Sequence, residues 1–117
     1  RYAMFEIIHH RNNIGNRIGD AIENKDETLL KELILSAMAF YLEDKLTKEE
    51  LDVLATMYLT IPIELKWEDE FKFKDNKLHY VMEELSAIEV VEDKRARENV
   101  KRFILYLQDK EYEKLET

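Results

Sequence analysis

The clearest local signal in the chain is the stretch LTKEEL at residues 46–51. Thr47 followed by Glu50 is a capping box, in which a hydroxyl and a carboxylate satisfy free N–H groups at the start of a helix. Apolar residues then recur at the spacing of one buried helical face, namely Leu51, Leu54, Ala55, Tyr58 and Leu59. Pro62 disfavours helical geometry at the residue before it, so this helix is predicted to end at Ile61.

Two helices are predicted before this stretch. Residues 2–23 place apolar side chains every three or four positions, and a second helix, capped by Asp26 or Thr28, runs to about residues 41–44. The short link between them predicts an antiparallel hairpin. Because its apolar stripes are broad for so short a chain, the hairpin of residues 2–44 is predicted to form a homodimer.

The sequence after residue 62 is less regular. Residues 63–73 fit either a strand or a helix, residues 75–86 fit a helix, and the β-branched run at 88–91 fits a short strand. Residues 100–115 fit a helix, although 100–107 also fit a strand that leads into a shorter helix. The aromatic side chains at 67, 71 and 73 are interpreted either as core contacts or as an exposed patch for a partner.

The composition restricts the class of protein. The 117 residues fit one domain, residues 1–117, and only two glycines and one proline are present, so an all-β fold with many turns is disfavoured. The chain has no cysteine, which excludes disulfides and thiolate metal sites. No apolar run approaches the roughly 20 residues of a membrane span. A mainly α, cytoplasmic protein without a membrane segment is predicted.

The charge is uneven. A net charge of −8 disfavours a protein that coats nucleic acid over its whole surface. Residues 94–102 depart from this, because five basic side chains and one acidic side chain give that segment a charge of +4. Such a run is either a binding surface or the solvated start of a C-terminal helix.

The order of elements over residues 46–107 resembles the winged helix-turn-helix domains of MarR-type regulators. A capped helix comes first, then an irregular segment, a further helix, and two apolar runs that flank a basic stretch. The residues that carry the resemblance are Leu46-Thr47, Val53-Leu54, Leu78, Met82, Ile88, Val90-Val91 and Lys94-Arg95-Ala96-Arg97.

The resemblance implies a winged-helix core at residues 46–117 and a partner, double-stranded DNA. The runs 88–91 and 100–107 would pair as a two-stranded β wing, and helix 75–86 would enter a major groove. The wing and the segment after it would hold phosphates. The nucleic-acid-binding residues implied are Lys74, Asn76, Lys77, His79, Lys94, Arg95, Arg97, Lys101 and Arg102.

Two alternatives remain open. The first is a non-enzymatic helical interaction module, such as an inhibitor, adaptor or immunity-type protein, whose acidic surface binds a basic partner protein. The second is phosphotransfer, because His9 or His10 on a helical hairpin is similar to the phosphoacceptor of two-component kinases, although Arg11 stands where an acidic residue is usual. No catalytic motif, third metal ligand or cofactor-binding loop is identifiable, so no enzyme activity, metal or cofactor is predicted.

Overall fold

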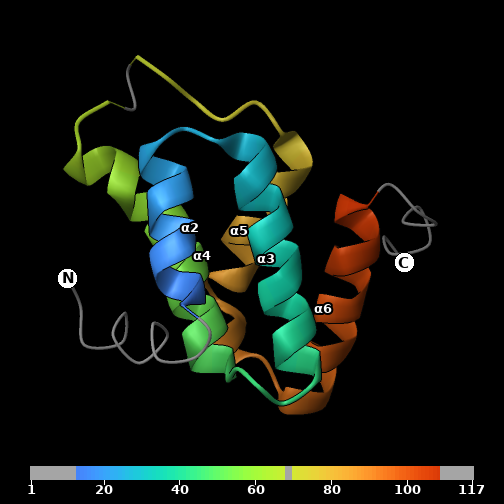
Figure 1. The fold of residues 1–117 in the computed structure, drawn as a ribbon. Helices are drawn as coiled ribbons and strands as arrows, with labels where there is room; N and C mark the ends of the chain where they lie inside the picture. The colour runs from blue at the N-terminus through green and yellow to red at the C-terminus, as the bar shows by residue number, and fades with distance from the viewer. Residues whose placement is uncertain (1–12, 68–69, 109–117) are drawn as a thin grey trace.

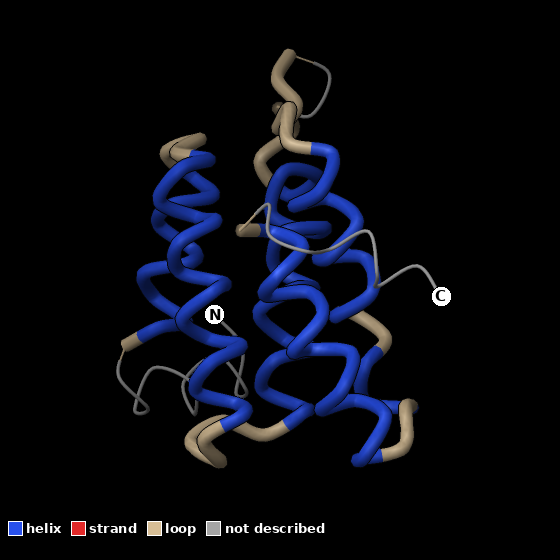
Figure 2. Tube along the Cα trace, turned by 90° about the vertical axis from the view of Figure 1, so that its right-hand side faces the viewer, coloured by secondary structure: helices blue, strands red, loops and turns tan. Residues whose placement is uncertain are grey.

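The computed structural model describes residues 13–67 and 70–108, and within these ranges it contains only helices and loops (Figures 1 and 2). The prediction of a mainly α fold is therefore confirmed. None of the described helices is long and apolar enough to cross a membrane. The elements are α2 (Ile14–Glu23), α3 (Glu27–Leu42), α4 (Lys48–Glu64), α5 (Asn76–Leu85), the short 3₁₀ helix η1 (Ile88–Val90) and α6 (Asp93–Leu107).

The helices pack around one core. α2 and α3 form an antiparallel hairpin as predicted, although α2 begins only at Ile14, because Asn13 has left-handed backbone with a φ angle of 63°. α4 packs against both helices, and α6 lies along α3 (Figure 1). α5 fills the space between α4 and α6, and η1 returns the chain to α4. The described parts of the connection between α4 and α5, residues 65–67 and 70–75, lie at the end of the bundle where α4 stops and α5 starts (Figure 1).

The predicted caps at the helix starts are confirmed. The Thr47 hydroxyl accepts from the Glu50 N–H at 3.1 Å, and the Glu50 carboxylate accepts from the Thr47 N–H at 2.8 Å. Asp26, one of two residues proposed to cap α3, accepts from the Leu29 N–H. Asp75 caps α5 in the same way. These four side chains fix where three helices begin.

Three helices end with the same motif, although none ends at a glycine. Lys25, Asp44 and Lys66 follow the last turns of α2, α3 and α4 and have φ angles of 58°, 65° and 60°. In each case the next residue donates its N–H to a carbonyl five positions back, as in a Schellman motif. A chain with two glycines therefore still makes compact turns, at the cost of left-handed backbone in residues that do not favour it.

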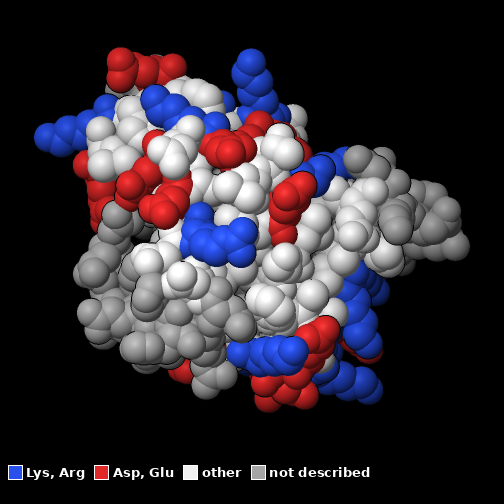
Figure 3. Space-filling view, viewed as in Figure 1, with Lys and Arg blue, Asp and Glu red and all other residues white. Residues whose placement is uncertain are grey.

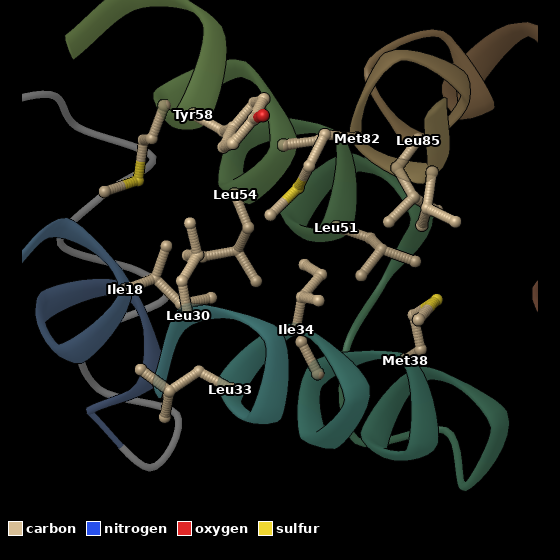
Figure 4. Close-up of a cluster of buried hydrophobic side chains, with 14 of the residues drawn as sticks. Ile18, Leu30, Leu33, Ile34, Met38, Leu51, Leu54, Tyr58, Met82 and Leu85 are labelled. Atoms are coloured by element: carbon tan, nitrogen blue, oxygen red, sulfur yellow. The ribbon is translucent and has the colours of Figure 1, made fainter. Parts of the chain in front are cut away.

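The core draws on the helices from α2 to α6. Figure 4 shows Ile18 of α2, Ile34 of α3, Leu54 of α4 and Met82 of α5 converging on one cluster. The apolar stripes of α2 and α3, which suggested a dimer, are buried inside the single chain from Ile14 onward. The part of that prediction that rests on residues 2–12 lies outside the described residues.

Residues 88–107 do not form the predicted β wing. The run at 88–91 is a single 3₁₀ turn, closed by the Val91 N–H donating to the Ile88 carbonyl, with Ile88 in the core. Residues 93–107 are one α-helix whose buried side chains, Ala96, Val100, Phe103 and Leu107, are four, three and four positions apart. The sequence prediction counted Ala96 with the polar stretch and therefore did not recognise this helical spacing. In the structure, burial of these four side chains outweighs the β propensity of the apolar runs.

Two cations hold the start of α6 against the rest of the bundle. The Lys48 ammonium group donates to the Val91 carbonyl at 2.6 Å and lies 2.8 Å from Asp93. The hydrogen bond between Lys48 and Asp93 raises the pKa of the lysine and lowers the pKa of the carboxyl. Arg97 donates to the Leu42 carbonyl at the end of α3 and to Asp44 at 3.2 Å.

Arg97→Ala is expected to lower the free energy of unfolding by about 1–2 kcal/mol, because a charged donor to an otherwise free helix-end carbonyl is lost. Arg95→Ala is the matched control, since Arg95 is exposed on the same turn of α6. Urea unfolding of both variants tests this. Equal stabilities would show that the contacts of Arg97 contribute nothing.

A candidate partner-binding groove between α4 and α5

The groove begins where α4 ends, three residues later than predicted. The helix continues through Pro62 to Glu64, because a proline in the last turn removes only one hydrogen bond, its own to the Tyr58 carbonyl. The Schellman motif then places Trp67, whose N–H donates to the Pro62 carbonyl at 3.3 Å. An apolar contact between these two positions is typical of the motif, and both residues line the groove.

Four aromatic rings from α4 and the connection pack together. Trp67, Phe71 and Phe73 contact one another edge to face, with ring centroids 5.2–6.1 Å apart. Phe73 also stacks on Tyr58 of α4 at 5.4 Å. The two interpretations of these aromatics therefore both hold in part. Trp67 is 8% exposed and belongs to the core, whereas Phe71 and Phe73 are half-buried and form walls of an open groove.

The connection is held against the tip of the α2–α3 hairpin. The Lys25 ammonium group lies 4.9 Å from the Trp67 ring centroid and 5.3 Å from that of Phe71, which is cation–π geometry. The Glu27 carboxylate accepts from the Asp75 N–H at 2.8 Å, and Lys31 lies 3.5 Å from the Asp75 carboxylate. The cluster is therefore fixed at both ends of the connection.

The groove has a volume of about 370 Å³ and lies between the end of α4, the connection and the start of α5. Ile63 on its wall is 62% exposed, and Leu65, two residues further along the chain, is 47% exposed. Its lining residues are Tyr58, Leu59, Pro62, Ile63, Trp67, Phe71, Lys72, Phe73, Asn76 and His79. A concave, mostly apolar surface with aromatic rings and a few polar groups is typical of a binding site.

Tyr58 and His79 contact each other on the α5 side of the groove, and His79 also faces Glu83. The Tyr58 hydroxyl lies 3.2 Å from Nδ1 of His79, and Nε2 of His79 lies 3.2 Å from the Glu83 carboxylate. Burial, together with the carboxylates of Glu27, Asp75 and Glu83, raises the pKa of Tyr58 to about 12. Tyr58 is therefore a neutral hydrogen-bonding wall of the groove and not an activated nucleophile at neutral pH.

The structure brings only part of the nine predicted nucleic-acid-binding residues near one another. Lys77 lies over the Tyr106 ring, so the start of α5 is beside the end of α6, whereas Arg97 is tied to the end of α3 at the opposite end of the bundle. Since α6 has 15 residues, these ends are about 20 Å apart. The residues near the start of α5 are Lys74, Asn76, Lys77 and His79, and those along α6 are Lys94, Arg95, Arg97, Lys101 and Arg102.

The predicted recognition helix presents carboxylates as well as polar groups. Glu83 and Glu84 are exposed on α5, and His79 is hydrogen-bonded to Tyr58 and paired with Glu83. Asn76 and His79 are exposed on α5 and also line the groove. On the face in Figure 3, side chains of both signs are interspersed, so the net negative charge is not gathered into one acidic patch on that face.

No family model, curated protein or solved structure matches the chain. Among the described residues, no cluster of three or more histidine and carboxylate side chains has the arrangement of a metal site. His9 and His10, the predicted phosphoacceptors, lie outside the described residues.

Sequence reasoning found the aromatic residues of the connection but missed the α4 side of the groove. Tyr58 was assigned to the core alone, and Ile63 was placed beyond the end of the helix. The available signal was the i, i+4 relation of Tyr58 with Pro62 and of Leu59 with Ile63, which places all four on one side of a helix that continues through the proline.

Proposed function

We propose that this protein is a non-enzymatic helical interaction module, of the inhibitor, adaptor or immunity type, that binds a partner protein through the aromatic groove. The observation that carries the proposal is the largely apolar groove, whose wall residue Ile63 is 62% exposed. Such a surface is costly to leave in water, and interfaces favour aromatic side chains at their centre. The groove is also preorganised, because its walls stand on α4 and α5 and the connection is pinned by Lys25 and Glu27.

Ile63→Glu is expected to weaken partner binding by about 30-fold or more, since it places a charge on an apolar wall of the groove. Val90→Glu is the matched control. Val90 is 86% exposed and equally β-branched, but it lies on η1 at the other end of the bundle. The measurement is recovery of cross-linked partner from source-cell extract, with a photoreactive residue in place of Leu65.

Wild-type protein and the Val90→Glu variant should yield the same discrete cross-linked protein, and the Ile63→Glu variant should not. Far-UV circular dichroism checks that the three proteins remain folded. Equal cross-linking by the two glutamate variants, or no discrete product from the wild type, contradicts the proposal.

Duplex DNA binding is the second candidate, and the exposed cations of α6 favour it. Lys94, Arg95, Lys101 and Arg102 all lie on its solvent-facing side. These side chains would contact phosphates without reading bases. The predicted recognition helix, α5, carries exposed carboxylates, which disfavour its entry into a DNA groove. A duplex shift at low salt that is lost in a Lys101→Glu, Arg102→Glu variant would establish this function in place of the first.

A further inference from the structure

The size of the groove limits what part of a partner enters it. A volume of about 370 Å³ lies at the low end of the range for ligand sites. One or two apolar side chains fill such a space, whereas a whole helix does not. The rings that line it come from Tyr58, Trp67, Phe71 and Phe73, which suits an aromatic or branched aliphatic side chain.

Trp67 adds a requirement for a hydrogen-bond acceptor. Its side chain is 8% exposed, and nothing in the described ranges accepts a hydrogen bond from its Nε1–H. A buried donor without an acceptor costs free energy, and such groups are rare in folded proteins. Because Nε1 is covered, an incoming acceptor reaches it only when a neighbouring side chain moves. An oxygen beside the apolar side chain of the partner would then satisfy it.

The charges at the groove select the kind of acceptor. Lys72 lines the groove and is exposed, and no ion pair to it is found among residues 13–67 and 70–108. The other basic group in the lining, His79, already faces Glu83. The carboxylates of Glu27, Asp75 and Glu83 act on Tyr58 in the same lining, so the groove presents its cation at Lys72 and not over its whole surface. A carboxylate complements that cation better than an ammonium group does.

We infer that the groove binds an aromatic or branched aliphatic side chain of a partner protein that lies within one or two residues of an aspartate or glutamate. This inference rests on the proposed function and specifies the chemistry of its partner. The apolar side chain contacts the four rings, the neighbouring carboxylate pairs with Lys72, and an oxygen of the same segment accepts from Nε1 of Trp67.

Three blocked tetrapeptides of equal length test this inference on the full chain. Their sequences are Glu-Phe-Leu-Glu, Lys-Phe-Leu-Lys and Glu-Ala-Ala-Glu. Trp67 is the only tryptophan of the protein, so its indole N–H gives one signal in a ¹⁵N–¹H correlation spectrum. Titration of that signal reports binding at the groove directly.

The acidic apolar peptide is expected to shift the indole signal and to bind about fivefold more tightly than the lysine peptide. The alanine peptide should produce no shift. Lys72→Glu should reverse the order of the acidic and basic peptides, whereas Lys94→Glu, on distant α6, should leave it unchanged. A lysine peptide that binds as tightly as the acidic one, or a Lys72→Glu variant with the original order, overturns the inference.

The two proposals fail separately. If Ile63→Glu abolishes the cross-link but no peptide shifts the indole signal, the interaction module stands and the inferred partner chemistry is wrong. If the acidic peptide binds as expected while Ile63→Glu leaves the cross-link intact, the groove chemistry stands and the proposed docking of the partner is wrong.

Discussion

Leu54→Ala is expected to lower the free energy of unfolding by about 3 kcal/mol. Leu54 is fully buried and points from α4 into the cluster shared with α2, α3 and α5 (Figure 4). Removing its branched end loses the transfer free energy of the side chain and leaves a cavity that helices on all sides prevent from closing. Urea unfolding, with the slope held common to both proteins, measures the loss.

Leu105→Ala is the control for this experiment. It removes the same atoms from a leucine that is 37% exposed on α6, and we expect a loss of about 0.5 kcal/mol or less. If the two variants lose similar stability, α4 is not the centre of the core and the arrangement of the helices described above is incorrect.

Tyr58 is expected to make the protein lose stability in alkali, by an amount of the order of 2 kcal/mol between pH 10 and pH 12. The folded-state pKa of about 12 lies above the ordinary value of 10.0, so folding favours the neutral phenol. The resulting stabilisation is fully present below pH 10 and is lost as the pH rises through 12. Urea unfolding at pH 8, 10, 11 and 12 follows it.

Tyr58→Phe isolates this contribution from those of the other tyrosines and the lysines. The variant has no phenol to ionise at position 58, so its stability should fall less steeply over the same pH range. At pH 8 it should be only modestly less stable, by about 1 kcal/mol for the lost hydrogen bond to His79. Parallel pH profiles for the two proteins would show that burial of the phenol does not raise its pKa.

The helices that begin at a side-chain cap were predictable from the sequence. The Thr47/Glu50 box and Asp26 act locally, over three residues, and no distant contact changes what they favour. The burial of Leu51 and Leu54 follows from the same start point, because the cap fixes which residues share a face. For these segments local preference and global packing agree.

The segments that were predicted incorrectly are those where distant contacts decide the structure. Ile88 to Val91 has the composition of a strand, but no second strand is available, because Val100 and Phe103 are needed on the buried face of α6. Lys48 and Arg97 then fix the start of that helix through partners 43 to 55 residues away. The spacing of apolar residues within 88–107 contains no information about these distant partners.

The groove was only partly predictable from the sequence, because distant contacts also decide how its aromatic residues are arranged. Trp67, Phe71 and Phe73 stand out in the sequence, but their distribution between core and surface depends on Lys25 and Tyr58, which belong to other elements. The nine basic and polar residues assigned to nucleic acid were selected by their order in the chain. The antiparallel packing of α5 and α6 places Lys77 beside Tyr106, on the half of α6 that carries Lys101 and Arg102, and leaves Lys94, Arg95 and Arg97 at the other end of that helix.

Pro62 gives one wall of the groove a different local stability from the rest of α4. Since proline has no N–H, the Tyr58 carbonyl has no helical donor, and the turn that carries Ile63 is held by one hydrogen bond fewer than the turns around Leu54. Local opening of that last turn therefore requires less free energy than opening of the helix centre. We therefore expect amide hydrogen exchange to be faster in the last turn of α4 than around Leu54, while the core beneath the groove stays closed.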